Sequence, residues 1–264
     1  MRSIWKGHIR FSLVTIPVTI FNGIETKTTV SFNQLHKEDN GRVGYVKVCK
    51  TCDQKMEKDD IVKGYQYEKD QYVIIESEEL SSLKLKSTSS IDIEAFVDMN
   101  EVHPSRFDSV YYVGPQGEVA QGTFSLLRQV LENTGKAGIG KVVLRDRETP
   151  VLLAPLDKGI VMYKLRYPYE IRSVKNVPDL EEETIKVDDA QMKLAEQLVD
   201  SLSKPFEEVV FEDKYRDAVM EMVNAKVEGR EVVVMAEAAE EPVVDIMSAL
   251  KASIEEAKKL KKGA

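Results

Sequence analysis

The feature that most constrains the fold is a succession of short strand-like segments, separated by turn residues, over residues 1 to about 175. The first of them, within RSIWKGHIRFSL, alternates apolar with polar or basic side chains, which is the period of a half-buried strand. The apolar phase shifts at Val14, which predicts a bulge or a break in this strand. Further along, Asn40 and Gly41 are a strong signal for a hairpin turn. Strands at this spacing predict a β-barrel or β-sandwich, interrupted by one helix over residues 123–135 that ends at a glycine.

After Pro178 the pattern changes to the period of amphipathic helices. Residues 187–206 begin near two aspartates, which suit a helix N-terminus, and residues 213–229 end at a glycine. A third helix is predicted for residues 242–262, after the linker sequence AEAAEEP. Because a tethered helix has less guarantee of a core, its apolar stripe is the best candidate for a partner-binding face. The stripe consists of Val243, Ile246, Met247, Leu250 and Ile254.

The net charge of −8 is unevenly distributed along the chain. Residues 1–50 carry 8 Lys and Arg against 3 Asp and Glu, a balance of +5. Residues 136–175 carry 9 against 4, again +5, whereas residues 181–245 carry 7 against 19, a balance of −12. A basic part that suits a polyanion is therefore joined to an acidic helical part, and whole-chain charge says little about binding. Ordinary solvated surface is the alternative explanation for both basic regions.

The sequence contains no recognisable catalytic constellation. Residues 135–141, GKAGIGK, match part of a phosphate-binding loop, but Val142 stands where a Mg²⁺-binding Ser or Thr is needed. The predicted order of helix, glycines and strand is also the reverse of the order that places a helix N-terminus at a phosphate. Neither GxSxG nor HExxH occurs, and only three histidines are available as general bases. We therefore expect a protein that is not an enzyme.

Cys49 and Cys52 form a CxxC and are the only two cysteines. A redox pair normally opens a helix within a βαβ unit, so this strand-rich context favours zinc over thiol–disulfide chemistry. Structural zinc takes four ligands. One chain offers the two thiolates and, across the hairpin, His36, whereas two copies in a symmetric dimer would supply four thiolates. Two surface thiols without a metal are the remaining alternative.

No apolar stretch reaches the ~18–20 residues that a membrane span requires. The basic N-terminus lacks the uninterrupted apolar core and the cleavage site of a signal peptide. Two cysteines are also too few for a secreted disulfide scaffold. We expect a cytoplasmic protein in a reducing compartment.

Several motifs, in their order along the chain, closely resemble those of the prokaryotic Ku proteins. They are RSIWKGHIRFSLVTIPV, FNQLH, the CxxC followed by DDIVKGYQYEKDQYVII, DSVYYVGP, LLRQVL and LRYPYEIR. The resemblance runs from residue 1 to about residue 250. It implies a nucleoid-associated, homodimeric factor of non-homologous end joining, built on a β-barrel core whose two arms close a ring through which a DNA end threads. It also implies no catalytic activity, no required cofactor, and recruitment of a multifunctional ATP-dependent repair ligase through a short C-terminal segment.

The resemblance divides the chain into a β-barrel core (1–178), a helical arm (179–236) and a ligase-recruiting helix with a short basic end (237–264). The family's bridge over the DNA corresponds to about residues 36–67. A ring that accepts any broken end touches phosphate and sugar, so its inner wall needs lysine and arginine. The expected DNA-binding cations are Lys37, Arg42, Lys47, Lys50 and Lys63 in the bridge and, as weaker candidates, Arg2, Lys6, Arg10, Arg145 and Arg147.

The sequence also departs from the family's pattern in one respect. Many bacterial members carry a long Lys-rich extension, whereas this sequence ends at KKLKKGA, which puts any function of such a tail in doubt. The alternative function is that of a zinc-knuckle RNA- or single-strand-binding protein. Such a protein would stack bases on exposed aromatic side chains and would be indifferent to DNA ends. A thiol oxidoreductase would need a lowered cysteine pKa.

Overall fold

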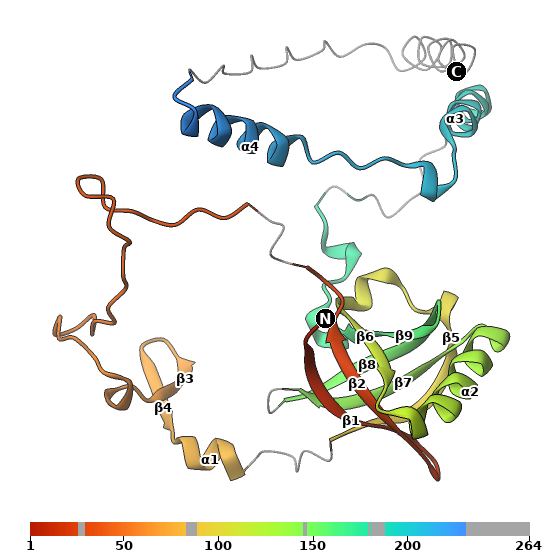
Figure 1. The fold of residues 1–264 in the computed structure, drawn as a ribbon, viewed down its shortest axis with the longest axis horizontal. Coiled ribbons are helices and arrows are strands. Elements are labelled where there is room, and N and C mark those ends of the chain that lie inside the picture. The colour runs from red at the N-terminus through yellow and green to blue at the C-terminus, as the bar shows by residue number, and fades with distance from the viewer. Residues whose placement is uncertain (26–29, 83–88, 145–146, 179, 181–187, 231–264) are drawn as a thin grey trace. The chain divides into compact units, whose positions relative to one another are not determined.

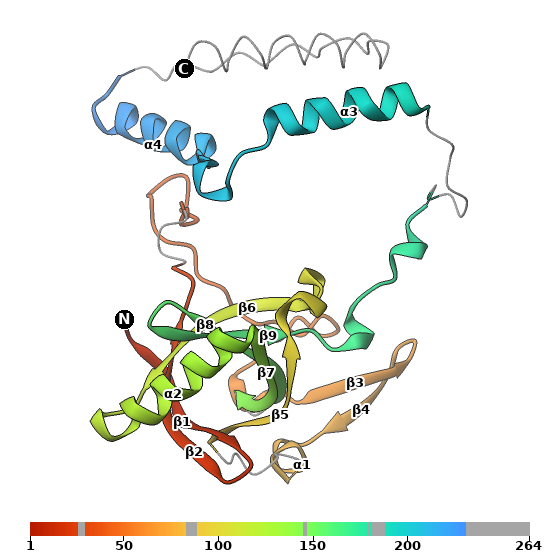
Figure 2. The same ribbon diagram turned by 90° about the vertical axis from the view of Figure 1, so that its right-hand side faces the viewer.

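The computed structural model covers residues 1–264 and describes all of them except 26–29, 83–88, 145–146, 179, 181–187 and 231–264 (Figure 1). The chain divides into two compact units, Met1–Asn176 and Val177–Ala264. The first unit holds a closed barrel of seven strands and, between the second and third of these, a long segment with a separate two-stranded sheet (Figures 1 and 2). The second unit contributes helices.

The barrel strands are hydrogen-bonded in the order β1-β2-β6-β9-β8-β7-β5. Neighbouring strands are antiparallel except β1 and β5, which run parallel and close the barrel. Closure leaves the sheet without a free edge on which another strand could pair. The strands are β1 (Ser3–Phe11), β2 (Val14–Asn22), β5 (Ser90–Asp98), β6 (Phe107–Pro115), β7 (Lys136–Leu144), β8 (Arg147–Leu156) and β9 (Gly159–Leu165).

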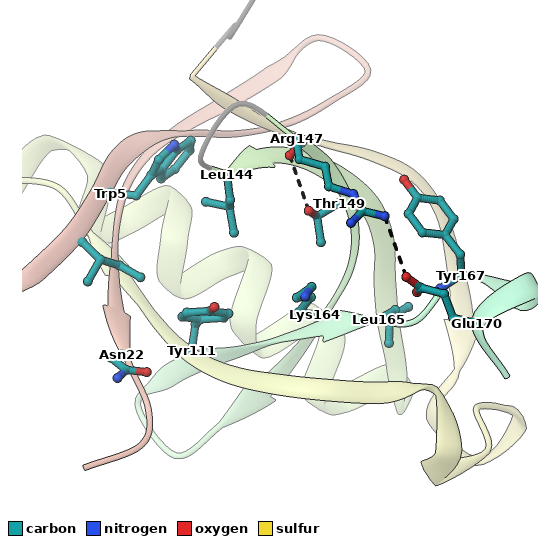
Figure 3. A pocket seen from close by; sticks show the side chains of 11 residues that line it. Trp5, Asn22, Tyr111, Leu144, Arg147, Thr149, Lys164, Leu165, Tyr167 and Glu170 are labelled. Carbon is teal, nitrogen blue, oxygen red and sulfur yellow. Dashed lines mark hydrogen bonds and ion pairs between the residues drawn. The ribbon is translucent and has the colours of Figure 1, made fainter. Parts of the chain in front are cut away.

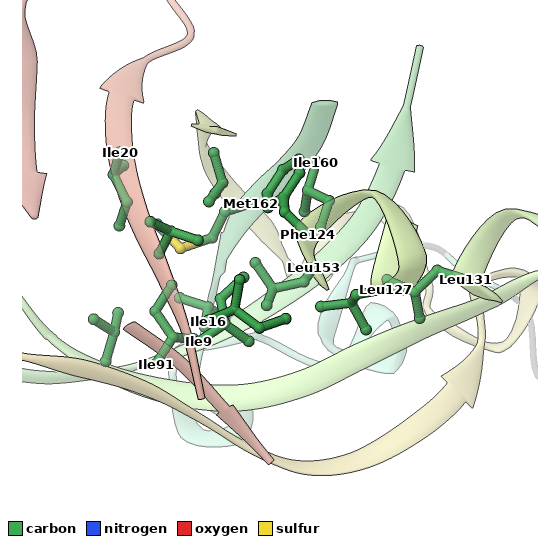
Figure 4. Packing of buried hydrophobic residues seen from close by; sticks show 14 residues of the cluster. Ile9, Ile16, Ile20, Ile91, Phe124, Leu127, Leu131, Leu153, Ile160 and Met162 are labelled. Carbon is green, nitrogen blue, oxygen red and sulfur yellow. The ribbon is translucent and has the colours of Figure 1, made fainter. Parts of the chain in front are cut away.

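The core fills the barrel and continues under helix α2 (Glu118–Thr134), which packs against β2, β6, β7 and β8. Figure 4 shows three α2 side chains, Phe124, Leu127 and Leu131, in the same cluster as inward-facing strand residues. The predicted helix is confirmed, although it begins five residues earlier than expected. Its C-cap, Gly135, has φ 64°, and β7 follows at once, so Gly138 and Gly140 lie within a strand and no helix begins after them. The strand residues of the cluster include Ile9, Ile16, Ile20, Ile91, Leu153, Ile160 and Met162.

The bulge or break expected in the first strand is instead the tight turn of a hairpin. β1 ends at Phe11, Ser12 adopts a left-handed φ of 49°, and β2 pairs back antiparallel from Val14. Because Leu13 is apolar, the sequence does not mark this turn, although the residue is 97% exposed. The shift in apolar phase therefore marks the change from one strand to the next.

Gly7, in the Trp5-Lys6-Gly7 motif, lets the β1 backbone lie very close to Ser89 and to the Trp5 ring where β1 pairs with β5. A Cβ built on it would lie 2.0 Å from the Ser89 carbonyl oxygen and 2.2 Å from the Trp5 ring. The next residue, His8, donates its N–H to that same carbonyl at 2.9 Å. The β1 backbone therefore cannot move away from Ser89 without losing this hydrogen bond.

Gly7→Ala is therefore expected to lower the free energy of unfolding by about 2 kcal/mol or more, the cost of overpacking a close-packed site. Urea denaturation followed by circular dichroism measures the change. Gly44→Ala is the matched control, because a Cβ at Gly44 has nothing within 4 Å. Equal stability of the two variants would contradict a steric role for Gly7.

The segment between β2 and β5 has no core of its own. Among its described residues from 30 to 82, none is buried. It contains the two-stranded sheet of β3 (Lys63–Glu68) and β4 (Gln71–Ile75) and the short helix α1 (Ser77–Ser82). Many of its apolar side chains are at least 45% exposed, so it has the composition of an interaction surface. They include Phe32, Val43, Tyr45, Val46, Val48, Val62, Val73 and Ile74.

The turn expected at Asn40 and Gly41 forms, but without long flanking strands. Asn40 has φ 58°, whereas Gly41 is outside the left-handed region, and the single flanking bridge joins Leu35 to Arg42. Hydrogen bonds of the Asp39 carboxylate to the Gly41 N–H and to the His36 ring hold the turn locally.

In the second unit, two of the predicted helices are confirmed as α3 (Asp189–Leu202) and α4 (Lys214–Val227). Each is capped by an aspartate that accepts a hydrogen bond from a backbone N–H in the first turn. α3 has no buried residue, so its apolar stripe lacks a core within the described part of the chain. The third predicted helix, 242–262, lies outside the described residues. None of the helices in the described ranges has the length and hydrophobicity that a bilayer span demands.

Candidate nucleic-acid interface

The cations predicted to bind DNA are exposed along the bridge segment, which we define as residues 36–67. The segment carries 7 Lys and Arg against 6 Asp and Glu, but residues 41–52 carry three cations and no acidic residue. Across the described ranges, no ion pair involves any of the five predicted bridge cations, and all five are exposed. Their charges are therefore available to a polyanion. They are Lys37, Arg42, Lys47, Lys50 and Lys63.

The second basic region, in contrast, is largely neutralised by carboxylates of the barrel. Lys136 pairs with Asp98 at 2.9 Å and Lys141 with Glu94 at 3.1 Å, and each lysine's pKa is raised, chiefly by its hydrogen bond to that carboxylate. Further along, Asp108 accepts from both Lys164 (2.8 Å) and Arg166 (3.0 Å). Its pKa is lowered, mainly by the hydrogen bond to Lys164. The local balance of +5 in residues 136–175 thus overstates the free positive charge of this surface.

The weaker candidates fall into different environments. Arg2 and Lys6 are exposed, but Arg10 pairs with Asp92 through Nε at 2.6 Å across the β1–β5 seam. Arg147 lies 3.7 Å from Glu170. Arg145 is outside the described residues. All five stay predictions, and their ion pairs rank Arg10 and Arg147 below the bridge cations.

A cavity of about 530 Å³ opens at the barrel where Trp5, Tyr111, Arg147, Lys164 and Tyr167 converge (Figure 3). Its charged groups are already satisfied, because Arg147 pairs with a carboxylate and Lys164 donates to another. The Tyr167 hydroxyl donates to a backbone carbonyl at 3.3 Å. The charged side chains of the described lining are therefore engaged with neighbouring groups rather than directed at the cavity.

Cys49 and Cys52 lie in a tight turn whose ends are joined by a bridge between Val48 and Lys55. The Cys49 N–H donates to the Gln54 carbonyl, and the Asp53 N–H donates to the Cys49 carbonyl, both at 2.9 Å. The pKa of the Cys49 thiol is lowered, first by the backbone N–H of Thr51, then by that of Cys52 and by its thiol. The turn therefore favours a thiolate, which both metal binding and redox chemistry need.

His36 is not brought to the cysteines, contrary to one of the arrangements expected. Its Nδ1 instead lies 2.9 Å from the Asp39 carboxylate. Over the described residues, no three or more His, Cys, Asp and Glu side chains come together as a metal site. One chain therefore supplies two thiol donors at this turn and no third ligand among these residues.

Exposed tyrosines in the bridge segment are functional candidates that charge counting missed. Tyr45 is 83% exposed, Tyr65 65% and Tyr67 54%. For Tyr65 and Tyr67 the sequence signal is the alternation in YQYEKDQY, which is typical of a strand with an aromatic face. Flat amphipathic rings on an exposed sheet can pack against the sugars or bases of a nucleic acid.

The predicted partner-binding stripe lies wholly outside the described residues. This applies to Val243, Ile246, Met247, Leu250 and Ile254.

Comparison with known proteins places the barrel in a family. Residues 10–194 match the family model described as the Ku70/Ku80 beta-barrel domain. The non-homologous end joining protein Ku of Heliobacterium modesticaldum is 40% identical over 262 residues, covering 98% of this chain and 93% of that protein. The protein of the same name from Archaeoglobus fulgidus is 39% identical over 260 residues, covering 98% of this chain and 100% of that protein.

The Bacillus subtilis protein of that name is 38% identical over 258 residues, covering 97% of this chain and 82% of its own length. The expected fold, a Ku-type β-barrel with helices after it, is confirmed by the closed seven-stranded barrel and the family match together. The motif resemblance found in the sequence is confirmed in the same way. The chain belongs to the Ku family.

Proposed function

We propose that this protein is a homodimeric ring that binds double-stranded DNA ends irrespective of sequence, in non-homologous end joining repair of double-strand breaks. The observation that carries the proposal is the near-full-length similarity to proteins named for that process. In this proposal the protein has no catalytic activity of its own, and the chain is organised as barrel core 1–178, helical arm 179–236 and recruiting segment 237–264.

The bridge segment supports the proposed DNA path. Phosphate contacts give affinity without sequence information, so a binder of arbitrary ends needs unpaired cations rather than base-reading side chains. Arg42, Lys47 and Lys50 meet this need, since they are exposed, make no ion pair with the described residues, and have no acidic residue within two positions in sequence. The barrel cations that are paired with Asp92, Asp98 or Asp108 fit a structural role better.

The homodimer is supported by apolar surface that a single chain does not cover. The described residues of 30–82 and of helix α3 include no buried side chain, although both stretches are rich in apolar residues. Surfaces of this kind in a water-soluble chain are typical of permanent interfaces. A second copy, related by a two-fold axis, is the simplest partner that would cover them.

Competition with single strands tests the proposal against the alternative of a single-strand-binding protein. We expect linear duplexes of unrelated sequence to compete equally for a labelled duplex. Single-stranded DNA or RNA of the same length is expected to compete at least about tenfold less well, because the unpaired cations are proposed to follow a duplex backbone. Stronger binding of single strands would favour stacking on exposed tyrosines such as Tyr45 and Tyr65 and would contradict the proposal.

Ligase recruitment through the C-terminal stripe is the finer part of the proposal. Truncation before Glu240 is expected to leave dimerisation and end binding intact and to abolish the stimulation of end joining by the cognate ATP-dependent ligase. The double substitution Ile246→Asp and Leu250→Asp should have the same effect, because it places charge on the apolar stripe. The Ser248→Asp variant is the matched control, and it should still stimulate end joining by the ligase. Loss of the dimer on truncation would instead assign this stripe to the protein's own assembly.

A further inference from the structure

Ion pairs engage almost all of the charged side chains on the barrel strands. Among the described residues, every Asp and Glu on these strands lies within 4.0 Å of a lysine or arginine nitrogen. Of the strand lysines and arginines, only Lys6 has no ion pair within the described part of the chain. The acidic members are Asp92, Glu94, Asp98, Asp108 and Glu148, and their partners are Arg10, Lys136, Lys141, Lys164 and, just after β9, Arg166.

Strand register places Asp98 and Asp108 against their partners. Asp98 of β5 lies opposite Lys136 of β7, and its carboxylate oxygen is 2.9 Å from the lysine nitrogen. Asp108 belongs to β6, which pairs with β9. One of its oxygens lies 2.8 Å from the Lys164 nitrogen and the other 3.0 Å from a nitrogen of Arg166. Two carboxylates therefore compensate three cations.

These pairs are too exposed to contribute much to the stability of the barrel. The side chains of Asp98 and Lys136 are 46% and 43% exposed, and those of Asp108 and Lys164 are 26% and 40% exposed. Water and salt screen ion pairs at such positions, so their contribution to folding is usually small. Their larger effect is on the electrostatic potential of the surface, because that potential sums all charges and changes when either partner is neutralised.

The pairing leaves uncompensated positive charge mainly on a different part of the chain. The bridge cations Arg42, Lys47 and Lys50 make no ion pair with the described residues, whereas the strand cations other than Lys6 are paired. Unpaired surface cations hold duplex through its phosphates, with or without an end. A barrel without its carboxylates would therefore offer DNA a second, side-on binding surface that requires no threading.

Such a side-on surface would work against the selection of ends. A genome presents about 10⁶–10⁹ competing non-specific sites, so affinity for internal duplex draws a protein away from a rare break. Each added phosphate contact strengthens binding to all of these internal sites, because the backbone charge is the same everywhere. A protein that selects ends therefore gains from having few free cations outside the path of the threaded DNA.

We propose that Asp98 and Asp108 are specificity-determining residues, which prevent side-on binding of intact duplex by compensating Lys136, Lys164 and Arg166. This inference rests on the proposed function, because it concerns the choice between ends and internal sites. The two carboxylates themselves contact no DNA. They act by keeping three barrel cations engaged.

The double variant D98N/D108N tests this role, since asparagine keeps the shape of the side chain and an acceptor oxygen but removes the charge. Its affinity for a relaxed closed circle is expected to rise about tenfold over wild type at physiological salt, because the freed cations add phosphate contacts. The slope of log affinity against log salt on the circle should steepen by about 0.9 for each added contact. Affinity for a short linear duplex, which is bound through its ends, should change less than about twofold.

Matched variants control for charge and for folding. E118Q/D157N removes the same number of negative charges from exposed residues that make no ion pair with the described part of the chain, so it should leave the affinity for the closed circle nearly unchanged. D98E/D108E keeps both charges and is expected to keep the wild-type preference for ends. The single variants D98N and D108N should show smaller rises in the same direction, and they decide the question if thermal melting shows that the double variant is unfolded.

Three results would overturn the inference. The first is an unchanged affinity of D98N/D108N for the closed circle. The second is an equal rise in E118Q/D157N, which would mean that net charge alone governs side-on binding. The third is an equal rise on circular and linear duplex, which would mean that the freed cations lie along the path of the threaded DNA.

The wild type separates this inference from the proposed function. If the wild type prefers ends and D98N/D108N prefers them equally, the inference fails and the proposed function stands. If the wild type binds closed circles as well as linear duplex, the proposed function fails. A rise on the circle that is confined to D98N/D108N would then still assign the two carboxylates to the suppression of side-on binding.

Discussion

Replacing Arg42, Lys47 and Lys50 together by glutamate is expected to weaken binding to linear duplex at least about 100-fold at physiological salt. Each of these side chains is proposed to make a charge-assisted contact to phosphate, worth about 1 kcal/mol or more, and every 1.4 kcal/mol is tenfold in affinity. In a homodimer the substitutions remove six cations and add six anions. Titration of a fluorescent duplex with the variant, at several salt concentrations, should also give a shallower dependence of affinity on salt, since fewer counterions are released.

The matched control changes the same number of charges in the same region. Lys55, Lys58 and Lys69 are exposed, and each has acidic neighbours in sequence, so their joint replacement by glutamate is expected to weaken binding far less. Both triple variants should keep the melting temperature of the wild type, because neither alters a buried residue. Equal losses in the two variants would mean that overall charge, rather than a path along residues 41–52, governs binding. Unchanged binding in the first variant would mean that DNA does not follow residues 41–52.

The barrel was predictable from the sequence because its first strand alternates apolar with polar residues and its helix carries a complete apolar face. Ile9 is buried while its neighbours His8 and Arg10 are exposed, and α2 buries the residues that its periodicity indicates. The first hairpin was misread because the apolar Leu13 shares its turn with Ser12, and no glycine, proline, asparagine or aspartate marks the turn. Closure by the parallel β1–β5 pair joins segments 82 residues apart at Arg10 and Asp92, a pairing that no local pattern encodes.

The candidate interface was predictable only in part, because sequence reveals cations but not their partners. Lys136 and Asp98 are 38 residues apart, and Arg166 and Asp108 are 58 apart, so their mutual neutralisation depends on strand register. By local charge balance alone, residues 136–175 and residues 1–50 are therefore equally good candidates for binding DNA. The fold separates the two regions, since the bridge cations lie on a segment without buried residues and the barrel cations lie beside carboxylates on neighbouring strands.

Ring topology leads to the second large effect. A ring that loads by threading needs a free end, so a covalently closed circle offers the same phosphates but no route onto the DNA. Electrostatic attraction to the outside of a circle would remain, but non-specific contacts of this kind are weak at physiological salt, with dissociation constants of about 10⁻⁴–10⁻⁶ M. The affinity for linear duplex should therefore exceed the affinity for closed circular duplex by more than about 100-fold, and this preference should persist as salt is raised.

The most direct measurement is a competition assay in which a labelled linear duplex is challenged by a relaxed closed circle or by the same circle cut once with a restriction enzyme. The two competitors have the same sequence and length, so they differ only in the presence of ends. The account predicts that the cut circle displaces the labelled duplex in proportion to its ends, while the closed circle does not compete even at about 100-fold excess by mass. Equal competition by the closed and the cut circle would contradict threading and, with it, the assignment of this protein as a ring that binds DNA ends.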